Sequence, residues 1–330
     1  MNEFLAGILA GINSVVNNYG WSIVVFTVLI KLVLFPLDFK SRKSMRKMQT
    51  VQPEVTKLQK KYANDKEKLN QKTMELYKRE KVNPMAGCVP LLLTMPILFA
   101  MFAAMRLIAN TELAKQAIDM ITTGVQNNEG WLWVKNLWMP DSPFAAVIAD
   151  QTSMQQITAD IWATVFAGLD SAKVATLANL GEGLAITAEN IDSTTVFAAL
   201  SQSDAYKQGM LAWETMPQVN LLITQLKIFA YPNGWLLLPI LAAGTQVLMT
   251  MFQPQAAPSA DNNAASTNKM MKYFMPLFSL FICFSYNAGF SLYWVASNLI
   301  AGAQGYVLNK YFDAQDKKVS SETVGEGSMK

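Results

Sequence analysis

Residues 20–38 read GWSIVVFTVLIKLVLFPLD, and Lys31 is the only charged residue between the glycine and the aspartate that bound this stretch. As a helix the stretch spans about 27 Å, close to the ~30 Å thickness of the hydrocarbon core of a bilayer. An ammonium group near the middle of such a helix costs at least ~2.5 kcal/mol on insertion scales. The cost is tolerable where Lys31 faces water, a partner charge or a hydrophilic cavity. The stretch therefore predicts a membrane span with a polar pocket beside it.

The composition is that of a membrane protein. Of 330 residues, 52% are hydrophobic and only 15% are charged, whereas about 25% of a soluble domain is charged. There is no histidine, and the two cysteines, Cys88 and Cys283, lie in apolar stretches where we interpret them as buried small hydrophobic residues. This inventory rules out a histidine-based nucleophile, argues against a zinc site and offers no phosphate-binding loop. We therefore predict neither an enzyme nor a cofactor.

Five membrane spans are predicted, each to within about three residues. They are 21–39, 86–107, 234–252, 270–287 and 289–308. The last two come from one uncharged run, Tyr273 to Asn309, which as a single helix would be ~55 Å long and too long for one crossing. Asn287-Ala288-Gly289 supplies a turn signal in its middle, so we predict two spans joined by a tight hairpin.

The orientation follows from the distribution of lysine and arginine. Segment 40–84 holds 14 Lys/Arg and 5 Asp/Glu, whereas segment 108–232 holds 5 Lys/Arg and 12 Asp/Glu. The positive-inside rule places the first segment in the cytoplasm and the second outside. Five spans then put the N-terminus outside, and both the loop 253–269 and the tail 309–330 in the cytoplasm.

The segments between the spans have distinct patterns. Residues 1–20 lack the basic start of a signal peptide and are expected to form an amphipathic helix in the outer interface, or else a frayed extension of the first span. The basic segment 40–84 predicts a helical hairpin that Pro53 interrupts and in which Asp65 caps the second arm. Such a hairpin would favour anionic lipid headgroups or ribosomal RNA; the alternative is a solvated linker.

The outer segment 108–232 has two parts. Trp131, Trp133 and Trp138 are expected at the outer interface. Residues 145–230 are expected to form an inserted helical module, with helices near 155–180 and 194–212, and the apolar run 161–166 is expected to touch the membrane surface. No chemistry is assigned to this module. The loop 253–269 is expected to be flexible, and the tail to be disordered after about residue 315.

Several motifs occur together in one order. They are an ionisable residue followed by Phe35-Pro36-Leu37, then MQTVQP (48–53), YKREKVNP (77–84), Gly87-Cys88-Val89-Pro90-Leu91-Leu92 with Met95-Pro96-Ile97, WVKNL (133–137), LPIL (238–241), Met275-Pro276 and GFSLYWVASNL (289–299). In these motifs, over roughly residues 18–144 and 232–312, the chain resembles the YidC/Oxa/Alb family of membrane protein insertases.

The resemblance implies a fold and a function. The family has an all-α integral membrane fold with a five-span core and a hydrophilic groove, open to the cytoplasm and to lipid but closed to the outside. It inserts nascent membrane proteins and helps them fold without nucleotide hydrolysis, and a monomer is expected to suffice. Ribosome, Sec translocon and anionic lipids are further partners that it implies. The expected location is a bacterial cell membrane.

The candidate groove residues come from two sources. Lys31 matches the arginine that charges the family's groove, and Thr27 lies one helical turn earlier on the same face. The family comparison places Tyr293, Trp294, Ser297 and Gln304 on the last span, facing the same groove. Thr94 and Thr245 are further candidates on the second and third spans.

The chain departs from the family pattern in several respects. Lysine keeps the charge of the arginine but loses its planar, bidentate fork. The module 145–230 has no counterpart in minimal bacterial members, and the short, neutral tail lacks a basic extension for ribosome docking. The large periplasmic domain of Gram-negative members and an N-terminal lipid anchor are not evident, which indicates a monoderm type.

Two other functions remain open at this point. A transporter or channel subunit would use Lys31 to bind an anionic solute, although the chain has no inverted repeat and only five predicted spans. A scaffold would use the outer module as its functional part. For Lys31 itself the alternative role is structural, in an ion pair, but no Asp or Glu occurs in any other predicted span.

Overall fold

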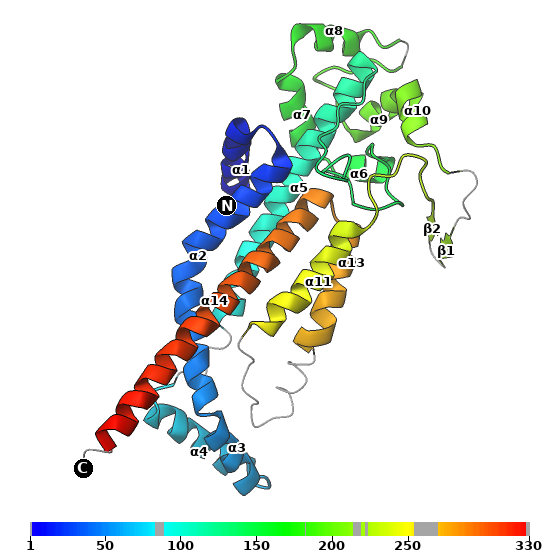
Figure 1. The fold of residues 1–330 in the computed structure, drawn as a ribbon. Coiled ribbons are helices and arrows are strands. Elements are labelled where there is room, and N and C mark those ends of the chain that lie inside the picture. The colour runs from blue at the N-terminus through cyan, green and yellow to red at the C-terminus, as the bar shows by residue number, and fades with distance from the viewer. Residues whose placement is uncertain are drawn as a thin grey trace. The chain divides into compact units, whose positions relative to one another are not determined.

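The computed structural model describes residues 2–82, 89–181, 183–213, 219–221, 224–253 and 270–327, so most of the predicted loop 253–269 lies outside the described residues. The chain forms two compact units. The first unit comprises Met1–Phe26, Ala100–Leu241 and Leu280–Trp294, and the second comprises Thr27–Phe99, Ala242–Ser279 and Val295–Lys330. Apart from one short antiparallel pair of strands, β1 (Val219–Leu221) and β2 (Thr224–Leu226), the described elements are helical (Figure 1).

Each predicted span overlaps one described helix. These are α2 (Tyr19–Thr50), α5 (Val89–Thr123), α11 (Leu237–Met251), α13 (Met275–Ser285, after a π-helical turn at Met270–Phe274) and α14 (Ala288–Gly327). Within the described chain, two helices, Tyr19–Thr50 and Met95–Thr123, are long and apolar enough to cross a membrane by themselves. Helix α14 continues to Gly327, so the expectation of a disordered tail after about residue 315 was wrong.

Two polar residues separate neighbouring helices. Asn17 adopts a left-handed φ of 54° and divides α1 (Asn2–Val16) from α2, so α1 is not an extension of the first span. Between α13 and α14, Asn287 accepts a hydrogen bond from the Phe290 amide at 2.8 Å through its side chain. The apolar run from Tyr273 is therefore divided into two helices, as predicted.

Helices α3 (Gln52–Lys61) and α4 (Lys66–Arg79) form a hairpin in the second unit (Figure 1). Pro53 lies in the first turn of α3, where its missing N–H costs nothing, and Asp65 caps α4 by accepting from the Lys68 amide, both as predicted. Buried Val55, Leu69 and Leu76 form the apolar side of the hairpin.

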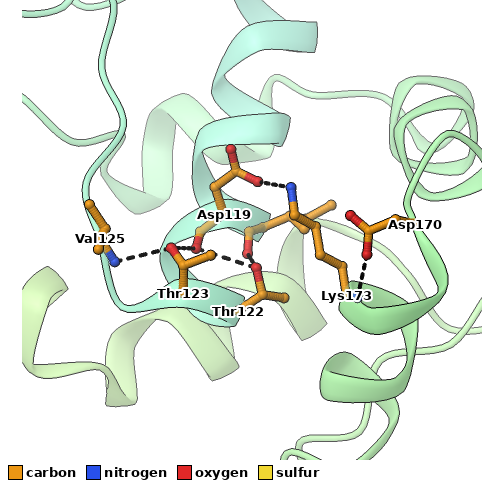
Figure 2. Close-up of polar contacts among 7 residues, drawn as sticks. Asp119, Thr122, Thr123, Val125, Asp170 and Lys173 are labelled. Carbon is orange, nitrogen blue, oxygen red and sulfur yellow. Dashed lines mark hydrogen bonds and ion pairs between the residues drawn. The ribbon is translucent and has the colours of Figure 1, made fainter.

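Among the described residues of the inserted module 145–230, five short helices belong to the first unit. They are α6 (Gln151–Gln155), α7 (Ala159–Ala167), α8 (Ser171–Ala178), α9 (Ser193–Gln202) and α10 (Asp204–Gly209). Figure 2 shows how α8 is tied to α5: Lys173 makes an ion pair with Asp119 at 2.7 Å, while Asp170 accepts from the Lys173 amide at 2.8 Å. The module is thus attached to the C-terminal end of a long helix.

The apolar run 161–166 lies partly inside this module: Trp162 and Val165 are buried, whereas Ala163 and Thr164 are exposed. Trp162 is fully buried, and its indole N–H donates to Ser193 Oγ at 3.0 Å. The expectation that this run touches the membrane surface was therefore wrong for Trp162. Its apolar pattern suits a protein core as well as a lipid surface, and only the packing of α7 against its neighbours distinguishes the two.

A buried carboxylate organises the region around α11 in the first unit. Asp141 has no exposed surface. It accepts from the Trp133 indole at 3.1 Å, from the Trp235 amide at 2.8 Å and from the Leu238 amide at 2.6 Å. The Leu238 amide belongs to the first turn of α11, where helix amides lack intrahelical partners and the helix dipole favours a negative charge. Asp141 thus caps a helix that begins almost a hundred residues later.

Two buried asparagines extend this network. Asn233 donates to the carbonyls of Asn136, Met139 and Pro140 at 2.9–3.0 Å, and accepts from the Asn136 amide at 2.7 Å. The network therefore holds the end of the tryptophan-rich stretch inside the protein: Trp138 is 2% exposed and packs edge-on against Tyr19. The expectation that Trp138 lies at the outer interface was wrong, whereas Trp131 and Trp133 are partly exposed.

Replacing Gly234 by alanine is expected to destabilise this region. An added Cβ would lie 1.8 Å from Asp141 Oδ1, so the carboxylate would have to move away from its donors. We expect a loss of about 2–3 kcal/mol in the free energy of unfolding, measured in detergent micelles. Gly244→Ala is the matched control, because nothing lies within 4 Å of its added Cβ. Alanine within helix α11 should leave stability unchanged or raise it by about 0.5–1 kcal/mol, so equal losses in both variants would contradict the prediction.

Candidate functional site

Lys31 lies in α2, in the part of this helix that belongs to the second unit. Its side chain is partly buried, and within the described chain it makes no hydrogen bond and no ion pair. The next two residues, Leu32 and Val33, are 60% and 79% exposed and present an apolar surface suited to lipid. The helix therefore carries an ammonium group without a direct counter-charge among the described residues.

An ion pair lies on the face of α2 that carries Lys31. Asp38 and Arg42 follow Lys31 by seven and eleven residues, which places all three on one side of a helix. Asp38 accepts from Arg42 Nε at 2.8 Å, and Arg42 is 6% exposed. The carboxylate closest to Lys31 along this face is therefore already bound to another cation, which leaves Lys31 as the group able to bind an anion.

Other polar side chains occur in the second unit. Thr27, one turn before Lys31, is fully buried. Thr245 on α11 is also buried, and its Oγ1 accepts from Asn298 Nδ2 of α14 at 3.4 Å. Asn298, and Gln246, which is buried and follows Thr245 in the sequence, were not among the predicted site residues. Each is an uncharged amide within an apolar stretch, and that pattern is the signal that would have identified them.

The remaining predicted residues fall into three groups. Ser297 and Gln304 belong to the second unit and are partly buried, on a strip of α14 about 100° from Asn298. Tyr293 and Trp294 belong to the first unit, where both rings lie near Phe290, with centroid distances of 6.2 Å and 5.6 Å. The side chain of Thr94 lies outside the described residues.

The chemistry available to this set is binding rather than bond-breaking. Lys31 can attract a carboxylate, and the threonine, serine and amide side chains can form hydrogen bonds with water or a polypeptide backbone. No group of three or more His, Cys, Asp and Glu within the described part of the chain is arranged to hold a metal. Fold and site thus define a helical protein of membrane type with a cation in an apolar helix and, among the described residues, no recognised catalytic group.

Comparison with known proteins identifies the family. A family model described as "60Kd inner membrane protein" matches residues 11–178 and 186–316. The chain belongs to this family, which is the YidC/Oxa/Alb family that the motifs had indicated.

The relatives are named membrane protein insertase YidC. That of Fusobacterium nucleatum is 51% identical over 106 residues, which cover 32% of this chain and 52% of the relative. That of Clostridium perfringens is 43% identical over 129 residues, or 38% and 47% of the two chains. That of Leptospira interrogans is 29% identical over 301 residues, covering 91% of this chain but 32% of the relative. The matches thus span about half or less of the relatives' length.

Proposed function

We propose that this chain is a membrane protein insertase of a bacterial cell membrane, whose substrates are nascent membrane proteins. The observation that carries the proposal is Lys31, a partly buried ammonium within an apolar helix that has no ion pair among the described residues. Ionisable residues at membrane depth are costly, and those that occur commonly serve a function. The family match and the names of the relatives support the same activity.

The proposed architecture is a five-span core whose hydrophilic groove opens to the cytoplasm and to lipid. The N-terminus lies outside and the C-terminus inside, in keeping with 14 Lys/Arg in segment 40–84 against 5 in segment 108–232. Thr27, Thr94, Thr245, Tyr293, Trp294, Ser297 and Gln304 line the groove with Lys31. The distribution of polar groups supports this arrangement, because Thr27 and Lys31 lie on one face of α2 and Thr245 lies against Asn298.

A substrate with a short acidic outer segment would enter this groove from the cytoplasm. A carboxylate 4 Å from Lys31 gains about 4 kcal/mol at an effective dielectric constant near 20, before desolvation and entropy costs. This gain is comparable with the ~2.5–3.5 kcal/mol that it costs to insert one acidic residue into a membrane. The apolar span of the substrate then moves into lipid by hydrophobic partition, so the proposed mechanism needs no nucleotide.

The helical hairpin α3–α4 is the proposed capture surface on the cytoplasmic side. It exposes lysines along both arms, including Lys57, Lys60, Lys61, Lys66 and Lys68. Exposed basic residues beside a membrane bind anionic headgroups, and such a surface also suits ribosomal RNA. The hairpin would therefore keep a ribosome or a substrate close to the groove. The Sec translocon is a further proposed partner, which the family resemblance implies.

Reconstitution tests the proposed function against the transporter alternative. Liposomes that contain the purified protein are expected to insert a single-span substrate with an acidic outer tail, whereas protein-free liposomes do not. Flux of an anionic solute is measured in the same vesicles. Solute flux without insertion would favour a transporter and contradict the proposal.

A further inference from the structure

Helices α11 and α14 of the second unit meet along a seam of small and amide side chains. The seam residues are Asn298, Gly302, Gly305 and Asn309 on α14, and, facing them, Ala242, Thr245 and Met249 on α11 with Phe252 just after its end. Both sets recur at intervals of three and four residues, which is the spacing of one helix face. Hydrogen bonds close the two ends of the seam: Asn298 bonds with Thr245 at 3.4 Å, and Asn309 Nδ2 donates to the Phe252 carbonyl at 3.2 Å.

The two glycines bring the helix backbones close together in the middle of the seam. A Cβ on Gly302 would lie 3.7 Å from Met249 Cα, and a Cβ on Gly305 would lie 3.0 Å from the Phe252 carbonyl oxygen. Small residues and interhelical amide bonds are the means by which helices associate in a membrane, where lipid removes the hydrophobic driving force. Opening the seam would leave the Asn298 amide, which lies well inside a predicted span, without its partner in apolar surroundings.

Arg42 of α2 forms hydrogen bonds at the end of this seam. Its Nη1 donates to the same Phe252 carbonyl at 3.2 Å, while its Nε donates to Asp38 at 2.8 Å. The Phe252 carbonyl lies at the C-terminal end of α11, where carbonyls lack intrahelical partners and the helix dipole favours a cation. A side chain at Gly305 would approach Arg42 Nη1 to 3.1 Å, so the glycine also makes room for the guanidinium. Three helices that are distant in sequence thus meet at one carbonyl oxygen.

We propose that Arg42 is a positioning residue that keeps the α11–α14 seam closed throughout insertion, so that a substrate span leaves for lipid by another face of the core. The inference rests on the proposed insertase function. It assigns Arg42 no contact with the substrate: the guanidinium acts through Phe252 and Asp38. A closed seam also preserves the hydrogen bond from Asn298 to Thr245.

The test combines an Arg42 variant with a reversible disulfide bond between α11 and α14. In a parent without Cys88 and Cys283, the pair Met249→Cys and Gly302→Cys places a cysteine on each side of the seam where the backbones are closest, since a Cβ on Gly302 would lie 3.7 Å from Met249 Cα. Arg42→Gln is expected to lower insertion into proteoliposomes about tenfold, since a hydrogen bond to a charged group contributes on that order. Oxidation of the cysteine pair should restore insertion, and a reductant should abolish the rescue.

Two controls define the outcome. Lys207→Gln removes an ion pair to Asp204 in which the side chains are 58% and 99% exposed, and should change insertion little because exposed pairs contribute little. The oxidised cysteine pair with Arg42 intact should insert as well as the parent. Loss of insertion in that disulfide-bonded protein, or an Arg42→Gln defect that oxidation does not rescue, would overturn the inference.

A readout independent of insertion separates this inference from the proposed function. Disulfide formation between the two introduced cysteines should be slower and less complete with Arg42→Gln than with Arg42, because the end of the seam has lost the hydrogen bonds of the guanidinium. Equal cross-linking in both proteins would overturn the positioning role. A parent that cross-links as expected but inserts no substrate would contradict the insertase function while leaving the closed seam in place.

Discussion

Lys31→Ala is expected to reduce insertion of substrates with an acidic outer tail by at least about tenfold. The substitution removes the cation of the proposed groove, and with it the attraction of about 4 kcal/mol that would offset the cost of a carboxylate at membrane depth. Lys31→Arg should retain most of the activity because the charge is preserved. The measurement is the protected fraction of a single-span substrate after insertion into proteoliposomes, compared for acidic and neutral versions of the same tail.

The matched control for this prediction is Lys43→Ala. Lys43 lies on the same helix and is exposed, so removing its charge should change insertion little. The neutral-tail substrate should also depend less on Lys31 than the acidic one does. Equal losses for both tails would indicate damage to the fold, and full activity of Lys31→Ala with the acidic tail would remove Lys31 from the mechanism.

Asp141→Ala is expected to give the largest loss of stability. The variant leaves the Trp133 indole and the Trp235 and Leu238 amides without an acceptor in a fully buried site. Unsatisfied donors and a disrupted buried network of this kind cost about 3–5 kcal/mol. The free energy of unfolding, followed by tryptophan fluorescence in detergent micelles, is the quantity to measure.

Two further variants make this result specific. Asp141→Asn keeps one carbonyl acceptor but places an NH₂ group toward a donor, so an intermediate loss is expected. Asp204→Ala removes a carboxylate that is 99% exposed and should change stability by less than about 0.5 kcal/mol. If Asp141→Ala were as mild as Asp204→Ala, the buried network would not hold α11 in place.

The features that the sequence predicted correctly are governed by local interactions. Asp65 caps α4 because its carboxylate reaches an amide three residues along the chain. Pro53 separates α2 from α3, and Asn287 separates α13 from α14, for similarly local reasons. The isolation of Lys31 within an apolar helix is likewise visible in the order of residues alone.

The features that the sequence did not predict depend on distant partners or on the rotation of a helix about its axis. Asp141 is separated by 97 residues from the Leu238 amide that it caps, and no short-range pattern connects the two. On α14, Ser297 was predicted for the groove, whereas its neighbour Asn298 is the residue that contacts Thr245. Tertiary packing decides which of two adjacent polar residues faces another helix, and for the same reason Trp162 was assigned to the wrong environment.

The proposed function depends most directly on water reaching position 31 from the cytoplasm. Lys31→Cys, in a parent without Cys88 and Cys283, can be treated with a membrane-impermeant maleimide in inverted and in right-side-out vesicles. Val33→Cys is the control, since Val33 is 79% exposed on an apolar surface where a thiol would remain unreactive in lipid. We expect the Lys31→Cys variant to be labelled in inverted vesicles alone, and the Val33→Cys variant to be labelled in neither. Absence of labelling at position 31 from the cytoplasmic side, or labelling there from outside, would contradict the account.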